Sequence, residues 1–429
     1  MSQLILRLVF VFLFSFYPLA VSAVPFGTYD PRSIAMGGAG VASGNSANAV
    51  FFNPSLLAQY TSRKHRARNS SYVFPVASLS VSKVAEDIAD LADSNPEQML
   101  SDSIAAYNAD PTQVSAAEGV LTASRNLQND LDPIANESVF FDGMVGMVIG
   151  IGDRREGGAF VISRRFVGDG IAEQSAADKQ LLADYIEGLD FIVSAGVSGA
   201  PHPELFDGNG NLLDQTNSLT SSATGRGLLL TELGIAMSWG IELFRNKIDV
   251  GFTPKFVQGT TYEYNGTLGS SQLGTTERKE DKDWQFTLDV GVSKAVNDKL
   301  KLGLVMKNLV PLDFDTQSGG SIRIQPQLRA GAAYRTAKWG YWALDVDVLE
   351  NKSIGGGDST QYLSLGGEYF VNTWALRAGY KQNIVGRGDF AKGVFTMGTG
   401  YHFMTVNLDV AYINSGPERA VSLQVSRRF

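Results

Sequence analysis

Apolar and polar side chains alternate with a period of two along most of the chain after residue 282. Between Trp284 and Val292 every even-numbered position is apolar, and the positions between them are polar or glycine. The same alternation runs through residues 300–306, 374–380 and 404–412. Because successive side chains of a strand point to opposite faces, this pattern predicts strands with one apolar face.

Extended along the chain, this pattern predicts fourteen strands. They are expected at residues 70–82, 138–152, 158–168, 226–244, 247–264, 283–296, 299–312, 322–336, 339–351, 360–370, 374–385, 391–402, 404–414 and 419–429. Long links follow the odd-numbered strands, and short turns such as Arg245-Asn246 follow the even-numbered ones. Bacterial outer-membrane barrels alternate long outer loops with short periplasmic turns in this way. We therefore predict an all-β membrane protein, a fourteen-stranded antiparallel outer-membrane β-barrel over residues 70–429.

Pro75 cannot donate to a strand ladder, so we expect it at a bulge or a strand start.

The two longest links, 83–137 and 169–225, carry helical signals. Asn95-Pro96 and Asp110-Pro111 each place a capping residue before a proline at the first helical position. Leu182, Tyr185 and Leu189 fall on one helical face of the second link. We therefore predict two helical extracellular loops.

The first 23 residues are typical of a secretory signal peptide. Arg7 precedes an apolar run from Leu8 to Phe14, and the small residues Val21-Ser22-Ala23 follow. A membrane anchor is the alternative, but the apolar stretch is short and contains Pro18. We expect cleavage after Ala23 and localisation in the outer membrane of a Gram-negative bacterium.

A glycine-rich segment, Met36-Gly37-Gly38-Ala39-Gly40-Val41-Ala42, lies between this signal and the first strand. It is followed by Phe51-Phe52-Asn53-Pro54-Ser55-Leu56-Leu57-Ala58. This arrangement resembles the N-terminal hatch of FadL-like outer-membrane barrels, which transport long-chain fatty acids, and most of all the hatch of conjugal-transfer TraF-type barrels. The resemblance implies that residues 24–69 form a hatch that plugs the barrel. It assigns the hatch and gating role to Gly37, Gly38, Asn53 and Pro54.

Charged side chains alternate with the apolar residues that are expected to face lipid, so they are expected to line the barrel lumen. The candidates are Asp289, Lys307, Arg329, Asp345, Asp347, Glu368, Arg377, Lys381 and Asp409. They could form a polar path through the lumen. Alternatively, because both signs occur, they could pair across neighbouring strands and be sealed by the hatch.

The sequence offers no arrangement that favours catalysis. Its three histidines, His65, His202 and His402, fall in the hatch, an outer loop and a region near a periplasmic turn, so no shared catalytic group or metal site is expected. The chain has no cysteine, which excludes thiol–disulfide chemistry. We predict a protein that is not an enzyme and needs no cofactor.

The formal net charge of −8 is distributed unevenly. Link 83–137 holds eleven acidic and two basic residues, and link 169–225 holds nine acidic and one basic residue. The outer loops are therefore strongly acidic and are expected to repel anionic solutes or attract divalent cations. Nothing in this balance favours nucleic acid as a partner.

Two functions remain open. The first is hatch-gated passage of small, possibly hydrophobic molecules through a barrel in contact with outer-membrane lipid. The second is a structural or assembly component of a conjugation or secretion apparatus that binds a periplasmic or envelope protein partner. The basic run Arg63, Lys64, Arg66 and Arg68 fits either a solvated linker or a docking site for an acidic partner.

Overall fold

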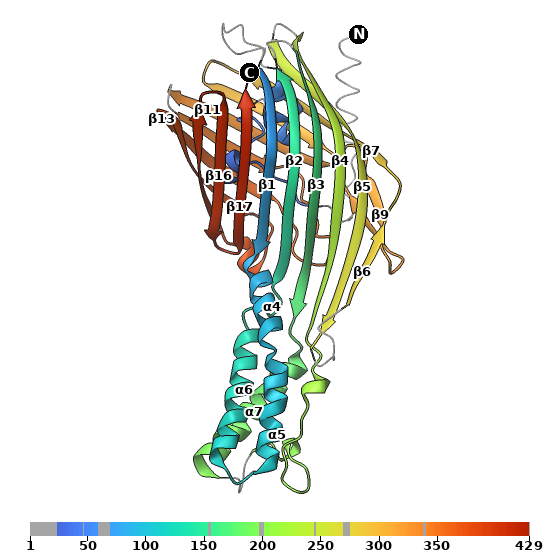
Figure 1. The fold of residues 1–429 in the computed structure, drawn as a ribbon, viewed down its shortest axis with the longest axis vertical. Helices are drawn as coiled ribbons and strands as arrows, with labels where there is room; N and C mark the ends of the chain where they lie inside the picture. The colour runs from blue at the N-terminus through green and yellow to red at the C-terminus, as the bar shows by residue number, and fades with distance from the viewer. Residues whose placement is uncertain are drawn as a thin grey trace.

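The fold is a closed antiparallel barrel. The computed structural model describes residues 24–45, 47–58, 69–152, 156–196, 201–243, 246–268, 275–337 and 340–428, and fourteen strands of this part of the chain form the wall (Figure 1). These strands are β1 (Asn69–Ser82), β2 (Ser138–Gly152), β3 (Glu156–Glu173), β4 (Ser222–Leu243), β5 (Asn246–Thr267), β7 (Gln285–Ala295), β8 (Leu300–Lys307), β11 (Gln327–Ala337), β12 (Gly340–Asp347), β13 (Tyr362–Val371), β14 (Trp374–Asn383), β15 (Val394–Phe403), β16 (Val406–Ser415) and β17 (Glu418–Arg428). The first strand pairs with the last, and β4 pairs with β5, so the ring has no open edge. The predicted fold class is confirmed.

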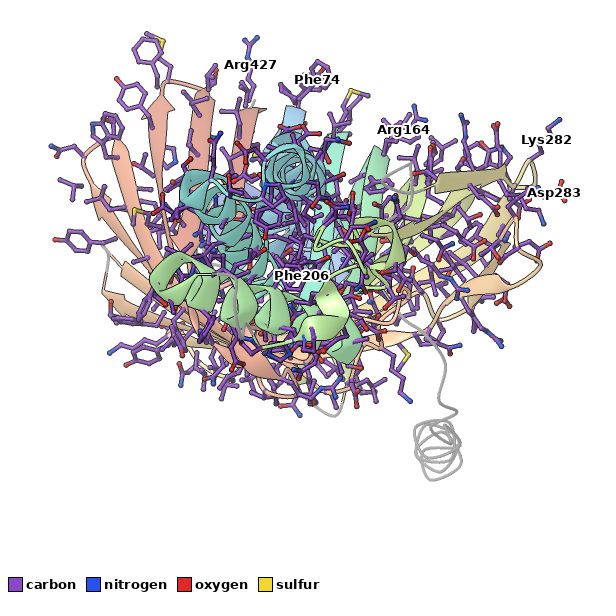
Figure 2. All side chains as sticks on the ribbon, turned by 90° about the horizontal axis from the view of Figure 1, so that it is seen from below. Phe74, Arg164, Phe206, Lys282, Asp283 and Arg427 are labelled. Atoms are coloured by element: carbon purple, nitrogen blue, oxygen red, sulfur yellow. The ribbon has the colours of Figure 1, made fainter. Side chains whose placement is uncertain are left out.

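The outer surface of the wall is apolar because the alternating pattern turns one face of each strand outward. Ile235, Leu344, Leu376 and Leu423 are exposed examples, one from each of four strands. At the rim, Phe74 and Arg427 point away from the barrel axis (Figure 2). Such a surface suits a hydrocarbon environment, and the closed ladder leaves no backbone edge unpaired there. Among the described residues, no helix is both long and apolar enough to cross a membrane.

The expected irregularity at Pro75 is confirmed. The pairing of β1 with both β2 and β17 shifts register between Val73 and Val76. This bulge accommodates the missing N–H of the proline without breaking the ladder.

The predicted strand 322–336 is wrong over its first part. Asn308 adopts a left-handed conformation (φ 52°) directly after β8, and the chain then forms a short hairpin of β9 (Leu312–Asp315) and β10 (Ser321–Ile324). The wall strand β11 begins only at Gln327. The short strand β6 (Thr275–Glu280) was not expected; it pairs antiparallel with residues 260–265 of β5, beyond the part of β5 that pairs with β7.

Four helices form a bundle at one end of the barrel, which we call the loop end (Figure 1). They are α4 (Lys83–Ser94), α5 (Pro96–Ala109), α6 (Val114–Leu131) and α7 (Ala176–Ala195). Leu100, Tyr107, Leu127, Leu182 and Tyr185 belong to its buried apolar core. This bundle, which we call the cap, confirms the helical character of both long links.

One expected helix start is displaced. Asp110 caps a turn rather than a helix, because its carboxylate accepts hydrogen bonds from the backbone N–H of Thr112 at 3.2 Å and from Gln113 Nε2 at 2.8 Å. The helix α6 therefore begins at Val114, three residues beyond Pro111. At the other long helix, Pro96 opens α5 as expected.

Residues 24–45 and 47–58 lie inside the barrel, and segment 24–58 is called the hatch below. They contain the short helix α2 (Pro31–Ala35), the single turn α3 (Ala49–Phe52) and the 3-10 turn η1 (Pro54–Leu57). Helix α2 contacts the side of the wall formed by β14 to β17, and η1 contacts β2 to β5 and β7. The hatch therefore reaches both sides of the lumen. The expected signal peptide and the basic run at residues 63–68 lie outside the described residues.

Candidate functional site: the plugged lumen

The hatch glycines make turns that approach the wall closely. Gly37 and Gly38 have φ of 71° and 94°, conformations that side chains rarely adopt. A Cβ on Gly37 would lie 2.5 Å from the backbone oxygen of Tyr380, and the Gly37 N–H donates to Thr396 Oγ1 at 2.9 Å. Gly37 thus lies where the hatch turns against β14 and β15, and Gly38 follows it beside Ser364 of β13.

The Asn53-Pro54 element holds the opposite side of the hatch. The Asn53 carboxamide oxygen accepts from the Ser55 N–H at 3.1 Å, which caps η1. Its Nδ2 donates to Val41 O at 3.1 Å inside the hatch and to Val292 O at 3.2 Å in the wall. One side chain therefore shapes the hatch and joins it to β7.

The wall facing the hatch consists largely of glycine at the points of closest approach. A Cβ on Gly291 would meet Asn53 Oδ1 at 2.0 Å, and one on Gly366 would meet Met36 Cβ at 2.4 Å. Wall glycines whose missing Cβ would lie within 3.0 Å of the hatch are Gly157, Gly251, Gly291, Gly303, Gly331, Gly366, Gly379 and Gly398. We call these residues the glycine belt. Without side chains there, the hatch fits directly onto the wall backbone.

A buried ion-pair chain fastens α2 to the wall. Arg32 Nη2 lies 2.7 Å from Glu368 Oε2, and its Nε donates to the same carboxylate at 3.0 Å. Arg377 Nε donates to Glu368 at 2.7 Å, and Arg377 Nη1 donates to Asp409 at 2.7 Å. Glu368 is thus shared between one hatch cation and one wall cation, deep inside the lumen.

Further polar contacts join the hatch backbone to predicted lumen residues. Asp345 Oδ2 accepts from the N–H groups of Gly40 at 2.8 Å and Val41 at 2.9 Å. The Lys307 ammonium donates to the backbone oxygen of Phe51. In this way a wall carboxylate and a wall cation satisfy buried backbone groups of the hatch.

The remaining predicted lumen residues are paired within the wall. Arg329 pairs with Asp347 between β11 and β12, and Asp289 lies 3.1 Å from Lys255. The ammonium of Lys381 lies 2.6 Å from the carboxylate of Glu418. All nine predicted residues line the lumen side of the wall, and the structure joins them in ion pairs or in bonds to the hatch.

Sequence reasoning missed three partners of these residues. Arg32 was available as the single cation of an otherwise uncharged stretch after Asp30-Pro31, but its partner lies 336 positions away. Lys255 lies inside the predicted strand 247–264, and Glu418 lies directly before the predicted strand 419–429. No sequence pattern marks either residue as a partner of a lumen charge.

The hairpin of β9 and β10 turns apolar side chains into the lumen. Leu312, Phe314, Ile322 and Ile324 are buried in a cluster with wall residues such as Leu230. A Cβ on Gly259 would lie 2.4 Å from the Phe314 ring, so the hairpin lies directly on β5. Alternation alone would place Ile322 and Ile324 on the lipid face of the predicted strand 322–336. The structure instead places them in an apolar part of the lumen.

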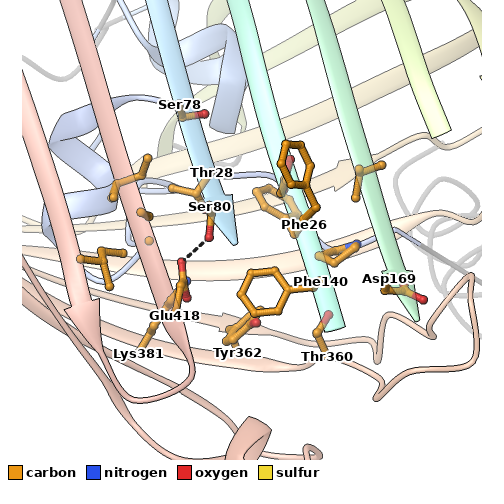
Figure 3. Close-up of a pocket in the computed structure, with 18 of the residues that line it drawn as sticks. Phe26, Thr28, Ser78, Ser80, Phe140, Asp169, Thr360, Tyr362, Lys381 and Glu418 are labelled. Carbon is orange, nitrogen blue, oxygen red and sulfur yellow. Dashed lines mark hydrogen bonds and ion pairs between the residues drawn. The ribbon is translucent and has the colours of Figure 1, made fainter. Parts of the chain in front are cut away.

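A cavity separates the hatch from the loop end (Figure 3). Phe26 and Thr28 of the hatch face Phe140, Tyr362 and the Lys381–Glu418 pair across it (Figure 3). Its empty space measures about 920 Å³, part of which is open to solvent. Charged side chains such as Asp142, Asp169 and Arg329 also line the cavity, which thus combines aromatic surface with polar groups, as small-molecule sites do.

The cavity is covered on the loop side by inward-folded segments. Asp169 accepts from Ser353 Oγ at 2.6 Å and from the Ile354 N–H at 3.0 Å, which holds the link after β12 against β3. Phe390, from the link after β14, packs edge-on against Phe140 with ring centroids 5.4 Å apart. Both covering segments are links between wall strands rather than parts of the wall itself.

A second, polar cavity lies on the other side of the hatch, at the end with the short turns. Lys299, Lys301 and Arg335 line it together with the hatch residues Ser43 and Asn45. The Arg335 N–H donates to Lys299 O at 2.8 Å, so these two cations lie opposite each other on neighbouring strands. Among the described residues, no ion pair involves these three cations.

The histidines lie apart, as far as they are described. His202 is in the segment after α7 in the cap, and His402 is on β15 near the turn end. His65 falls outside the described residues.

Comparison with known proteins gives a family match and several distant folds. The family described as "F plasmid transfer operon, TraF, protein" matches residues 50–348. No curated protein matches the chain significantly. The chain is similar to the toluene transporter TbuX of Ralstonia pickettii (11% identity, 94% of this chain and 99% of that one, TM-score 0.46). It is also similar to a FadL homologue of Pseudomonas aeruginosa (10% identity, 95% and 99%, TM-score 0.47) and to the toluene transporter TodX of Pseudomonas putida (11% identity, 95% and 98%, TM-score 0.44).

Proposed function

The chain belongs to the TraF family of the F plasmid transfer operon, and on this premise we propose that it is a non-enzymatic barrel of a Gram-negative outer membrane. Its hatch gates the passage of small hydrophobic molecules. The lipid of that membrane surrounds the apolar outer face of the wall, and the acidic cap faces the cell exterior.

One observation carries this proposal. The hatch separates an aromatic cavity on the loop side from a polar cavity on the turn side. A solute that passes the covering links from outside would reach Phe26, Phe140 and Tyr362 and would have to displace hatch contacts to go further. The apolar cluster around Phe314 extends the apolar lining beside the hatch. These features favour a small molecule with apolar surface over an ion or a sugar.

Binding of an apolar fluorescent probe tests the cavity. We expect N-phenyl-1-naphthylamine to bind the detergent-solubilised protein, and Phe140→Ala to weaken this binding about tenfold because it removes one aromatic wall and the contact with Phe390. Phe160→Ala is the matched control, since Phe160 lies on β3 and is exposed on the outer face. Equal binding by both variants would mean that the probe binds elsewhere.

An assembly role is the second candidate, and the polar cavity at the turn end favours it. The backbones of Lys299 and Arg335 lie opposite each other, which places two like charges at neighbouring positions of the turn end. An acidic segment of a periplasmic partner would supply the opposite charge. Lys299→Gln combined with Arg335→Gln should then abolish co-purification of an envelope protein and leave probe binding unchanged.

A further inference from the structure

Three carboxylates converge in the cap around one imidazole. His202 Nδ1 lies 3.1 Å from Glu204 Oε1 and 3.7 Å from Asp184 Oδ1. On the other side of the ring, Nε2 lies 3.2 Å from Glu187 Oε2. One ligand atom each from Asp184, His202 and Glu204 lies within 4.8 Å of the other two.

The fold brings these groups together from two segments. Asp184 and Glu187 are three residues apart on α7 and therefore share a helix face. His202 precedes the 3-10 turn η2 (Pro203–Leu205) and has φ 61° and ψ 54°. The buried Leu205 and the bond of the Tyr185 hydroxyl to Leu213 O dock this second segment on α7. The imidazole is thus held in place by packing that does not involve the carboxylates.

The imidazole distinguishes this cluster from the general acidity of the cap. Glu187 lies within hydrogen-bond distance of Nε2 and Glu204 within hydrogen-bond distance of Nδ1, so carboxylates on both sides orient the ring. Without a metal, a proton on Nδ1 joins the ring to Glu204; with the proton on Nε2 alone, Nδ1 offers a lone pair to an ion that Asp184 and Glu204 can also reach. In many zinc sites, the histidine that binds the metal through one ring nitrogen donates a hydrogen bond from the other to a carboxylate, which orients the ring.

The two separations from the imidazole nitrogen are compatible with a tetrahedral ion. Two ligand atoms, each about 2.0–2.1 Å from zinc, lie about 3.3 Å apart in tetrahedral geometry. The 3.1 Å and 3.7 Å separations from Nδ1 lie on either side of this value. An imidazole nitrogen among the ligands favours zinc-class ions over calcium and magnesium, which prefer oxygen alone.

We propose that Asp184, His202 and Glu204 bind a divalent transition-metal ion of the zinc class. Glu187 is the positioning residue that orients the imidazole. The ion ties α7 to the segment after it and neutralises part of the negative charge of the cap. This site lies outside the lumen and is independent of the proposed transport.

Zinc titration of the untagged, detergent-solubilised full chain tests the site. By isothermal calorimetry we expect one Zn²⁺ per chain and much weaker binding of Ca²⁺. His202→Asn and Glu204→Gln should each weaken Zn²⁺ binding at least 100-fold, and Glu187→Gln about 10–100-fold. Asparagine is chosen at position 202 because it tolerates the left-handed backbone.

Glu118→Gln is the matched control, because Glu118 is an exposed acid on α6 and its loss changes the net charge of the cap equally. Zn²⁺ binding that is absent, or that His202→Asn alters no more than Glu118→Gln does, would overturn the proposal. Ca²⁺ binding as tight as Zn²⁺ binding would overturn the choice of metal class. Should His202→Asn lose the helical signal in circular dichroism, Co²⁺ added to the wild-type chain decides: tetrahedral absorption bands support the site, and their absence refutes it.

Discussion

Replacing Arg32 by methionine should loosen the hatch. The Arg32 guanidinium donates twice to the buried Glu368 carboxylate, at 2.7 and 3.0 Å. Removing one partner of a buried pair costs about 3–5 kcal/mol. Because Glu368 keeps its bond to Arg377, we expect the lower end of this range, about 3 kcal/mol. At 1.4 kcal/mol per factor of ten, the ratio of open to closed hatch should rise about 100-fold.

Single-channel recording in planar bilayers measures this ratio directly. Lys255→Met is the control, since Lys255 pairs with Asp289 and Glu232 in the wall. Among the described residues, Lys255 makes no hydrogen bond or ion pair to the hatch. The two variants lose similar buried pairs but only one loses a hatch contact. If Arg32→Met opens no more often than Lys255→Met, the ion-pair chain does not hold the hatch.

Two further changes test other parts of the structure. Gly366→Ala should unseat the hatch at a cost of about 1–3 kcal/mol, because the new Cβ would lie 2.4 Å from Met36. Gly367→Ala is the control, since its Cβ lies on the outer face and meets only the Trp342 ring edge at 3.2 Å. Bilayer conductance and thermal unfolding compare the two variants. Burial raises the pKa of Tyr185 from 10 to about 12, so the stability that its neutral hydroxyl gives the cap is present below pH 10 and is lost as the pH rises through about 12. Circular dichroism should show helix loss in this range, and Tyr185→Phe should remove the dependence; an unchanged titration would refute the role of the Leu213 bond.

Much of the wall could be predicted because a membrane barrel imposes one rule on every strand. Lipid requires an apolar residue at every second position. This rule located all fourteen wall strands, and each predicted strand end lies within about five residues of the observed end. The rule failed at Ile322 and Ile324, since an apolar lumen cluster produces the same alternation as a lipid-facing strand. Only the left-handed Asn308 and the docking of Phe314 on β5 separate the two cases.

The site was predictable in its residue types but not in its partners. Gly37, Gly38, Asn53 and Pro54 stood out through a local motif, and the lumen charges stood out through their alternation. The pairing of Arg32 with Glu368 joins positions 336 residues apart, and strand register decides which carboxylate it meets. The convergence on His202 depends likewise on how two segments of the cap pack, which spacing along the chain does not reveal.

Deleting residues 24–58 tests the central claim most directly. The deletion removes the hatch and leaves the β1–β17 and β4–β5 pairings that close the wall. Conductance is measured in planar bilayers, after circular dichroism has shown that the strands are retained. If the hatch seals the lumen, the deletion should convert a nearly closed barrel into one with a large, steady conductance. A folded deletion variant with the conductance of the intact chain would contradict the account.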